Sequence, residues 1–143
     1  MTTTASTSTA ISASAERVWG LLTDRGWWEA SDNGVLRLEG TILEGRRVLV
    51  VSEDAPDRGS ELGVTEIHAP ATMLWTGGLP LGLCTGRRTF QVEATGDTCS
   101  FSMVEDVTGP LSPLVVRVLP DLQTSFDRFA LALKTDSEVV RGC

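Results

Sequence analysis

The last long segment of the chain, residues 112–140, repeats apolar residues with the 3.6-residue period of a helix. Ser112 and Pro113 favour a helix start, because serine caps the first turn and proline suits its first position. Pro120 interrupts the pattern and predicts a kink or break near residues 116–119, since it removes a backbone hydrogen bond. We therefore predict one long C-terminal helix whose apolar face comprises Val115, Val118, Leu119, Leu122, Phe126, Phe129, Ala130 and Leu133.

Most of the chain before that helix alternates apolar and polar residues in short runs, separated by turn residues such as Asn33 and Gly34. The exception is a pair of short helical segments. Ser14 caps the first, which ends near Asp24, and a helical turn or loop follows from Gly26. Residues 1–4 are expected to be frayed, and residues 77–82 to form a flexible apolar loop. Strands are predicted at residues 5–12, 35–43, 47–53, 61–68, 73–76, 85–94 and 99–106.

The short connections decide how these strands pair. Parallel neighbours need crossovers of about a dozen residues or more, so consecutive strands joined by short turns form an antiparallel meander. One face of such a sheet must be covered, and the long C-terminal helix is the element that can cover it. The pattern predicts a single α+β domain over residues 1–143.

The last hairpin predicts its own register. A four-residue loop at residues 95–98 places Arg88 opposite Glu105 on the same face of the sheet. The pairs nearer the turn are apolar, so this is predicted to be the inner face, with the charged pair at its far end. Arg88 and Glu105 form either an ion pair at the rim or a polar anchor inside a cavity. The apolar pairs are Ala94 with Cys99, Val92 with Phe101, and Phe90 with Met103.

Composition excludes several classes of partner. The net charge is −7, which argues against nucleic acid and an anionic membrane surface, because both attract Lys and Arg. No apolar run reaches the roughly 20 residues of a membrane span, and MTTTASTSTA at the start lacks the basic and apolar parts of a secretory signal. The three cysteines, Cys84, Cys99 and Cys143, have no ligand spacing, and no phosphate-binding loop is present. We expect a cytoplasmic protein with reduced thiols, no metal site and no cofactor.

Several stretches resemble the SRPBCC superfamily of START-like proteins, in particular its polyketide cyclase/dehydrase-like branch. They are residues 64–70 (VTEIHAP), 74–78 (LWTGG), 86–90 (GRRTF), 101–105 (FSMVE) and 109–111 (GPL). The resemblance implies a helix-grip fold, in which a curved seven-stranded antiparallel sheet wraps around the C-terminal helix, with two short helices between strands 1 and 2. It also implies a deep hydrophobic cavity between sheet and helix. Members include lipid and steroid carriers, plant hormone receptors and aromatase/cyclases, so the resemblance is specific for fold and not for reaction.

The tryptophans are the aromatic residues most relevant to such a cavity. Trp19 falls on the apolar face of the first short helix and is predicted to be core. Trp27 and Trp28 are adjacent, so one is expected to face away from the core. Together with Trp75, which shares a strand face with Met73, they form either a gate at the cavity mouth or a plug in a small core. In the gate interpretation, the apolar lip comprises Leu79, Leu81 and Leu83.

Candidates for chemistry are few. His68 is the only histidine, lies at a strand end, and is expected to be a surface residue. The chain contains no tyrosine. Cys84 and Cys99 lack a catalytic partner and are expected to be inert, with Cys99 facing inward. Candidate catalytic residues are Arg88, Glu105 and His68. Residues expected to line the cavity are Trp27, Trp28, Met73, Trp75, Leu79, Leu81, Arg88, Phe90, Phe101, Met103, Glu105, Leu122, Phe126, Phe129 and Leu133.

Three functions remain open from the sequence. The first is a carrier, sensor or sequestering protein for a small hydrophobic, aromatic or polycyclic molecule. The second is a cyclase/aromatase-like enzyme, in which Arg88 polarises a carbonyl and Glu105 or His68 moves a proton. The third is a protein with a filled core that acts through its surface or as a homodimer, which predicts no internal pocket above about 300 Å³.

Overall fold

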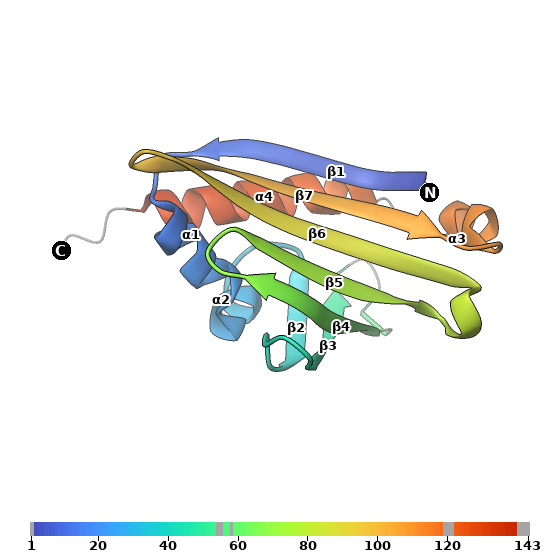
Figure 1. The fold of residues 1–143 in the computed structure, drawn as a ribbon. Coiled ribbons are helices and arrows are strands. Elements are labelled where there is room, and N and C mark those ends of the chain that lie inside the picture. Colours follow the sequence, from blue (N-terminus) through green and yellow to red (C-terminus); the bar gives the residue numbers. More distant parts are fainter. Residues whose placement is uncertain (1, 54–55, 58, 119–121, 140–143) are drawn as a thin grey trace.

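A computed structural model describes residues 2–53, 56–57, 59–118 and 122–139. The order of elements agrees with the predicted one: a strand, two short helices, six strands and a helical C-terminal segment (Figure 1). The elements are β1 (Thr2–Ile11), α1 (Ala15–Leu22), α2 (Arg25–Ala30), β2 (Val35–Gly40), β3 (Arg47–Ser52), β4 (Gly59–His68), β5 (Thr72–Leu79), a 3₁₀ turn (Pro80–Gly82), β6 (Cys84–Thr95), β7 (Thr98–Thr108), α3 (Ser112–Val118) and α4 (Leu122–Glu138).

The strands form one curved antiparallel sheet in the order β1-β7-β6-β5-β4-β3-β2. Strands β2 to β7 are neighbours in sequence and in space, as a meander requires, and β1 pairs with β7 at the edge. The α+β helix-grip fold is therefore confirmed. The predicted hairpin register is also confirmed, because Arg88 lies opposite Glu105 and Ala94 opposite Cys99.

Most strands differ from their predicted bounds by one to three residues, and four differences bear on the site and its surroundings. β1 begins at Thr2, which pairs with Val107, so residues 2–4 are not frayed. β2 ends at Gly40, whose φ of 100° leaves the extended region. Residues 77–79 belong to β5 because β6 offers them pairing partners, so only the 3₁₀ turn remains of the predicted loop. The predicted single helix is two helices, and residues 119–121, which include Pro120, lie outside the described residues.

Hydrogen bonds to the edge strand place α4 along β1. The side-chain amide of Gln123 accepts from Ser6 N and donates to Ser6 O. Lys134 Nζ donates to the carbonyl of Ala10, and Glu138 Oε2 accepts from the backbone N–H of Ser12 at 2.8 Å. Polar side chains of the helix thus satisfy backbone groups of an edge strand, which would otherwise be open to pairing with another chain.

The two short helices hold the C-terminal end of α4. Arg17 of α1 donates from Nε to the carbonyl of Ser137 at 2.6 Å and from Nη2 to that of Asp136. The Asp136 carboxylate accepts from Trp27 Nε1 at 2.8 Å and from the Ser31 hydroxyl at 2.6 Å. The last carbonyls of a helix lack partners within the helix, so Arg17 also stabilises its end. Hydrogen bonds from α1 and from the α2 region therefore fix the C-terminal end of α4 against the rest of the domain.

Candidate functional site

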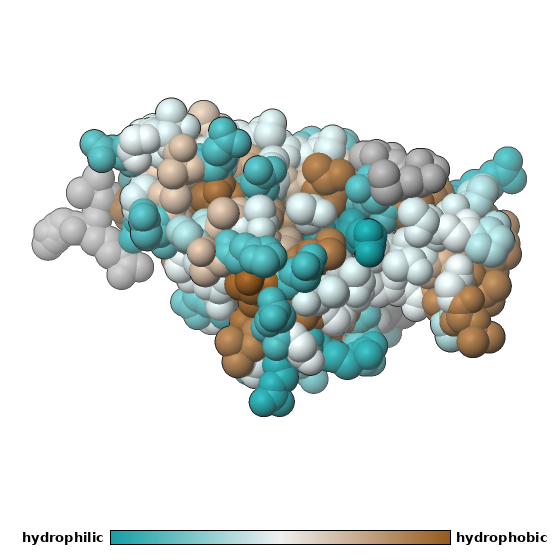
Figure 2. All heavy atoms as spheres, viewed as in Figure 1, coloured by the Kyte–Doolittle hydropathy of each residue, from teal (hydrophilic) through white to brown (hydrophobic). Residues whose placement is uncertain are grey.

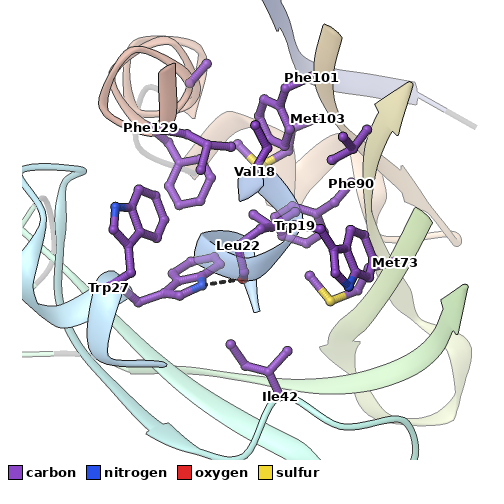
Figure 3. Packing of buried hydrophobic residues seen from close by; sticks show 14 of the residues in the cluster. Val18, Trp19, Leu22, Trp27, Ile42, Met73, Phe90, Phe101, Met103 and Phe129 are labelled. Atoms are coloured by element: carbon purple, nitrogen blue, oxygen red, sulfur yellow. Dashed lines mark hydrogen bonds between the residues drawn. The ribbon is translucent and has the colours of Figure 1, made fainter. Parts of the chain in front are cut away.

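An aromatic cluster fills the space between the sheet and α4 near the short helices (Figure 3). Trp28 stacks on Trp75 with centroids 5.2 Å apart, and it also contacts Phe90 and Phe129. Trp27 meets Phe129 edge-on at 5.4 Å. All five side chains are buried.

This cluster corrects one expectation about the adjacent tryptophans. Neither Trp27 nor Trp28 faces away from the core, because α2 turns Trp28 onto Trp75 while Trp27 reaches Phe129 and the Asp136 carboxylate. The contacts favour the plug over the gate. A ligand therefore finds no room here unless this packing is broken.

The inner face changes from aromatic to charged side chains at the row that Trp75 shares with β6 and β7. Trp75, Arg88 and Glu105 form one cross-strand row on this face. Arg88 Nε donates to Glu105 Oε1 at 2.9 Å, and their side chains are 20% and 13% exposed. The pair is thus neither fully buried nor a solvated rim pair. Both charged groups lie where the inner face begins to be exposed to solvent.

The next row toward the end of the sheet has almost no side chains in its centre. Gly77 and Gly86 are opposite each other on β5 and β6. A Cβ on Gly77 would lie 2.6 Å from Leu62 Cδ2, and one on Gly86 would lie 2.8 Å from Glu105 Oε2. The side-chain ends of Leu62 and Glu105 therefore lean over a floor of bare backbone. All four residues are half-buried, so the inner face begins to open to solvent here. We call the row of Gly77 and Gly86 the open row.

The start of α4 reaches the neighbouring charged row through Phe126. The guanidinium carbon of Arg88 is 5.0 Å from the ring centroid of Phe126, within the range of a cation–π contact. Leu122, one turn earlier, is half-buried and packs against the core. The sheet thus supplies a charged pair beside two glycines without side chains. The start of α4 supplies the apolar side chains of Phe126 and Leu122.

Beyond the site the molecule ends in exposed leucines. Leu79, Leu83 and, at 95% exposure, Leu81 come from the β5–β6 connection, and Leu114 comes from α3. Leu111 N donates to Leu83 O, which holds this connection against the start of α3. Figure 2 shows apolar atoms gathered at this end of the molecule. We call these four leucines the apolar tip.

Comparison with known proteins identifies the family. Residues 2–138 match the family model described as polyketide cyclase / dehydrase and lipid transport. The chain belongs to this family. A search of curated proteins by sequence finds no match.

Solved structures of the same fold have low sequence identity to this member of the polyketide cyclase/dehydrase family. The Aha1 dimer from Colwellia psychrerythraea is 17% identical, with a TM-score of 0.74 over 99% of this chain and 100% of its own. Truncated norcoclaurine synthase from Thalictrum flavum is 15% identical, with a TM-score of 0.67 over 95% and 93%. The di-domain ARO/CYC BexL of the BE-7585A biosynthetic pathway is 11% identical, with a TM-score of 0.71 over 97% and 48%. These likenesses show the fold.

The structure separates the residues predicted to line a cavity into three groups. Arg88, Glu105 and Phe126 meet beside the open row, and Leu122 is half-buried at the start of α4. Leu79 and Leu81 belong to the apolar tip. The others are buried in the core: Trp27, Trp28, Met73, Trp75, Phe90, Phe101, Met103, Phe129 and Leu133.

Of the remaining candidates for chemistry, His68 and Cys99 lie apart from the open row, and Cys84 lies two residues before Gly86 on β6. His68 is exposed at the end of β4, as expected, at the opposite end of that strand from Leu62. Cys84 and Cys99 are both buried, and burial raises the pKa of the Cys99 thiol, with a smaller contribution from Glu16. Cys84 is the first residue of β6.

Sequence reasoning missed the glycine floor and Leu62. A signal was present, because the predicted strands put Gly77 and Gly86 near the ends of neighbouring segments. The pairing of these two glycines depends on the β5–β6 register, which the connection at residues 80–83 does not reveal. Among the described residues, no group of three or more His, Cys, Asp or Glu side chains could hold a metal ion, and no helix is long and apolar enough to cross a membrane.

Proposed function

We propose that this protein binds a small, largely apolar molecule between the open row of the inner face and the start of α4, as a carrier, sensor or sequestering protein. The observation that carries this proposal is the transition along β5 and β6 from a packed aromatic core to a floor of Gly77 and Gly86. Ligand sites are concave and mostly apolar, with a few convergent polar groups. Phe126 and Leu122 would supply the apolar contact, and Arg88 and Glu105 the polar one.

The family supports the same class of ligand. Its description includes lipid transport, which handles apolar molecules. The apolar tip lies at the same end of the sheet as the open row, because Leu79 and Cys84 pair two positions beyond Gly77 and Gly86. An apolar molecule that enters from this end would meet leucines before it meets the charged pair.

The test is to fill the floor of the site. Gly86→Val places a side chain where only the movable end of Glu105 now lies. Gly63→Val is the matched control, because its Cβ would only touch Thr76, at 3.8 Å, and Gly63 lies on the outer face of β4. Neither glycine requires a positive φ.

The readout is binding of the neutral dye Nile red, followed by fluorescence and checked by calorimetry. We expect micromolar binding to the wild type and to Gly63→Val, and a loss of about tenfold or more in Gly86→Val, which corresponds to about 1.4 kcal/mol. No binding to any of the three proteins, or equal binding to all three, would contradict the proposal.

The half-buried pair also favours a second candidate function. Glu105 could accept a proton from the carbon next to a ligand carbonyl while Arg88 stabilises the enolate oxygen, which is general-base and electrostatic catalysis. Exchange of a bicyclic ketone's α-protons for solvent deuterium, followed by NMR, tests this step. We expect exchange above the buffer rate that Glu105→Gln abolishes and His68→Ala leaves unchanged. Exchange at the buffer rate in the wild type would rule out this function.

A homodimer is the remaining proposal about partners. A structural neighbour is described as the Aha1 dimer, and the apolar tip of this chain is exposed. Sedimentation velocity over a range of concentrations measures the oligomeric state. Dissociation of a dimer by Leu81→Ser would place the tip in the interface, and a monomer at every concentration would contradict the proposal.

A further inference from the structure

The indole nitrogen of Trp75 is a buried donor without an acceptor. Its side chain is 0% exposed, and Nε1 makes no hydrogen bond among the described residues. The other tryptophans of the cluster are satisfied, because Trp28 Nε1 donates to Leu22 O at 2.8 Å and Trp27 Nε1 donates to Asp136. An unpaired buried donor costs free energy, so native structures rarely contain one without a ligand, a water or a function.

Trp75 and its unpaired donor lie in the same cross-strand row as two charged side chains. Trp75 lies directly opposite Arg88 across the β5–β6 pair, and Arg88 lies opposite Glu105. Directly opposed side chains have Cβ atoms about 5 Å apart on the same face. Arg88 uses Nε for Glu105 Oε1, and within the described residues its two Nη atoms and Glu105 Oε2 make no hydrogen bond. Donors and an acceptor therefore remain free in one row.

The charges of this row decide which head group it suits. The guanidinium and the carboxylate cancel each other at 2.9 Å. An anionic head group would meet Glu105 in addition to Arg88, and a cationic one would meet Arg88 in addition to Glu105. A neutral group that can both accept and donate hydrogen bonds costs the least desolvation there and matches both kinds of partner.

We propose that Trp75, Arg88 and Glu105 form a polar anchor for the neutral, hydroxyl-bearing end of an otherwise apolar ligand. This anchor rests on the proposed function and specifies its ligand. The indole N–H and the guanidinium donate to the hydroxyl oxygen, and Glu105 Oε2 accepts the hydroxyl proton as a hydrogen bond. The apolar body of the ligand lies over Gly77 and Gly86.

Access to the anchor requires only side-chain movement. The atom nearest to a Cβ on each glycine is a side-chain end, Leu62 Cδ2 at Gly77 and Glu105 Oε2 at Gly86, and the backbone oxygen of Glu61 lies 3.0 Å from a Cβ on Gly77. Both side chains are half-buried. Leu62 packs against the core cluster and has other staggered rotamers, whereas Glu105 is held by its hydrogen bond from Arg88. The floor at Gly77 becomes available to a ligand when Leu62 turns away, and Glu105 Oε2 stays beside Gly86 as the acceptor of the anchor.

The first experiment compares three probes that share one apolar body. Naphthalene has no polar group, naphthol has a neutral hydroxyl, and naphthoate is an anion. Calorimetric titration of the wild type should show naphthol binding about tenfold tighter than either of the others, the increment of one well-placed hydrogen bond. Naphthoate as the tightest ligand would overturn the neutral anchor.

Two variants then assign the anchor to its residues. Trp75→Phe should lower the affinity for naphthol about tenfold and leave that for naphthalene within about twofold, because it removes the N–H and keeps an aromatic ring. Trp19→Phe, in a buried tryptophan of α1, should change neither affinity. Glu105→Gln leaves Arg88 uncompensated and should raise the affinity for naphthoate about tenfold.

A proton–nitrogen NMR spectrum of the wild type provides a readout that needs no folded variant. The indole resonance of Trp75, assigned by its absence in Trp75→Phe or by through-bond experiments, should shift with naphthol and not with naphthalene. Equal binding of all three probes without this shift would overturn the anchor and leave the proposed function intact. Binding of none of them, nor of Nile red, would overturn both.

Discussion

Arg88 rests its guanidinium carbon 5.0 Å from the ring centroid of Phe126, which links the inner face of β6 to the start of α4. A cation over an aromatic face is attracted by the ring quadrupole, and such contacts contribute about 0.5–2 kcal/mol depending on exposure. This contact and the ion pair with Glu105 hold the same side chain, so Arg88 joins three elements around the candidate site.

A double-mutant cycle measures the contact between Arg88 and Phe126. The single variants are Arg88→Met and Phe126→Leu, which keep most of the apolar volume. We expect a coupling energy of about 0.5–2 kcal/mol from urea unfolding, the usual contribution of a cation–π contact. The cost of leaving Glu105 unpaired occurs both in Arg88→Met and in the double variant, so it cancels in the cycle. Additive effects of the two substitutions would show that the contact contributes nothing.

Phe129 is the α4 residue that touches most of the aromatic cluster, because its ring meets those of Trp27, Trp28 and Phe101. Phe129→Ala should lower the free energy of unfolding by about 3–5 kcal/mol through lost contacts and the cavity left behind. Leu131→Ala is the control on the same helix, since Leu131 is exposed, and it should stay within about 0.5 kcal/mol. Similar losses in both variants would contradict the packed core.

We expect Glu138 to contribute to the loss of folding stability at acidic pH. A hydrogen bond from Lys134, at 2.6 Å, and one from the backbone N–H of Ser12 lower the pKa of this carboxyl. A folded-state pKa below the unfolded value stabilises the protein above the unfolded pKa, and this contribution is lost as the pH falls through the folded pKa.

Glu138→Gln should therefore reduce the loss of stability between about pH 6 and pH 2, measured as the urea midpoint. Glu93→Gln controls for the removal of one exposed carboxylate, because Glu93 has no hydrogen-bond partner among the described residues. An unchanged pH dependence in Glu138→Gln would show that its bonds to α4 and β1 do not form in solution.

Leu81 adopts a left-handed backbone conformation, with φ 60° and ψ 25°. Its side chain is 95% exposed, so no packing is lost when it is replaced. Leu81→Asn should raise the free energy of unfolding by about 0.5–1 kcal/mol, because asparagine tolerates this region better than leucine. Leu83→Asn, at a residue with φ −62°, should bring no such gain in thermal or urea unfolding. Equal effects at both positions would contradict the strain at Leu81.

The amino-acid sequence by itself determined the order of the elements, the meander and the register of the last hairpin. These features are local: short turns force antiparallel neighbours, and the connection at residues 95–98 sets Arg88 against Glu105.

Only the tertiary structure decided which part of the inner face is filled and which part opens. Trp27 and Trp28 gave no sequence signal of where α2 would turn them, and the pairing of Gly77 with Gly86 depended on the register across a connection of uncertain geometry. The unpaired Trp75 Nε1 and the stacking of Arg88 on Phe126 depend on where α4 lies over β6. That placement is set by contacts between residues more than 100 positions apart, such as Gln123 with Ser6, and periodicity cannot reveal them.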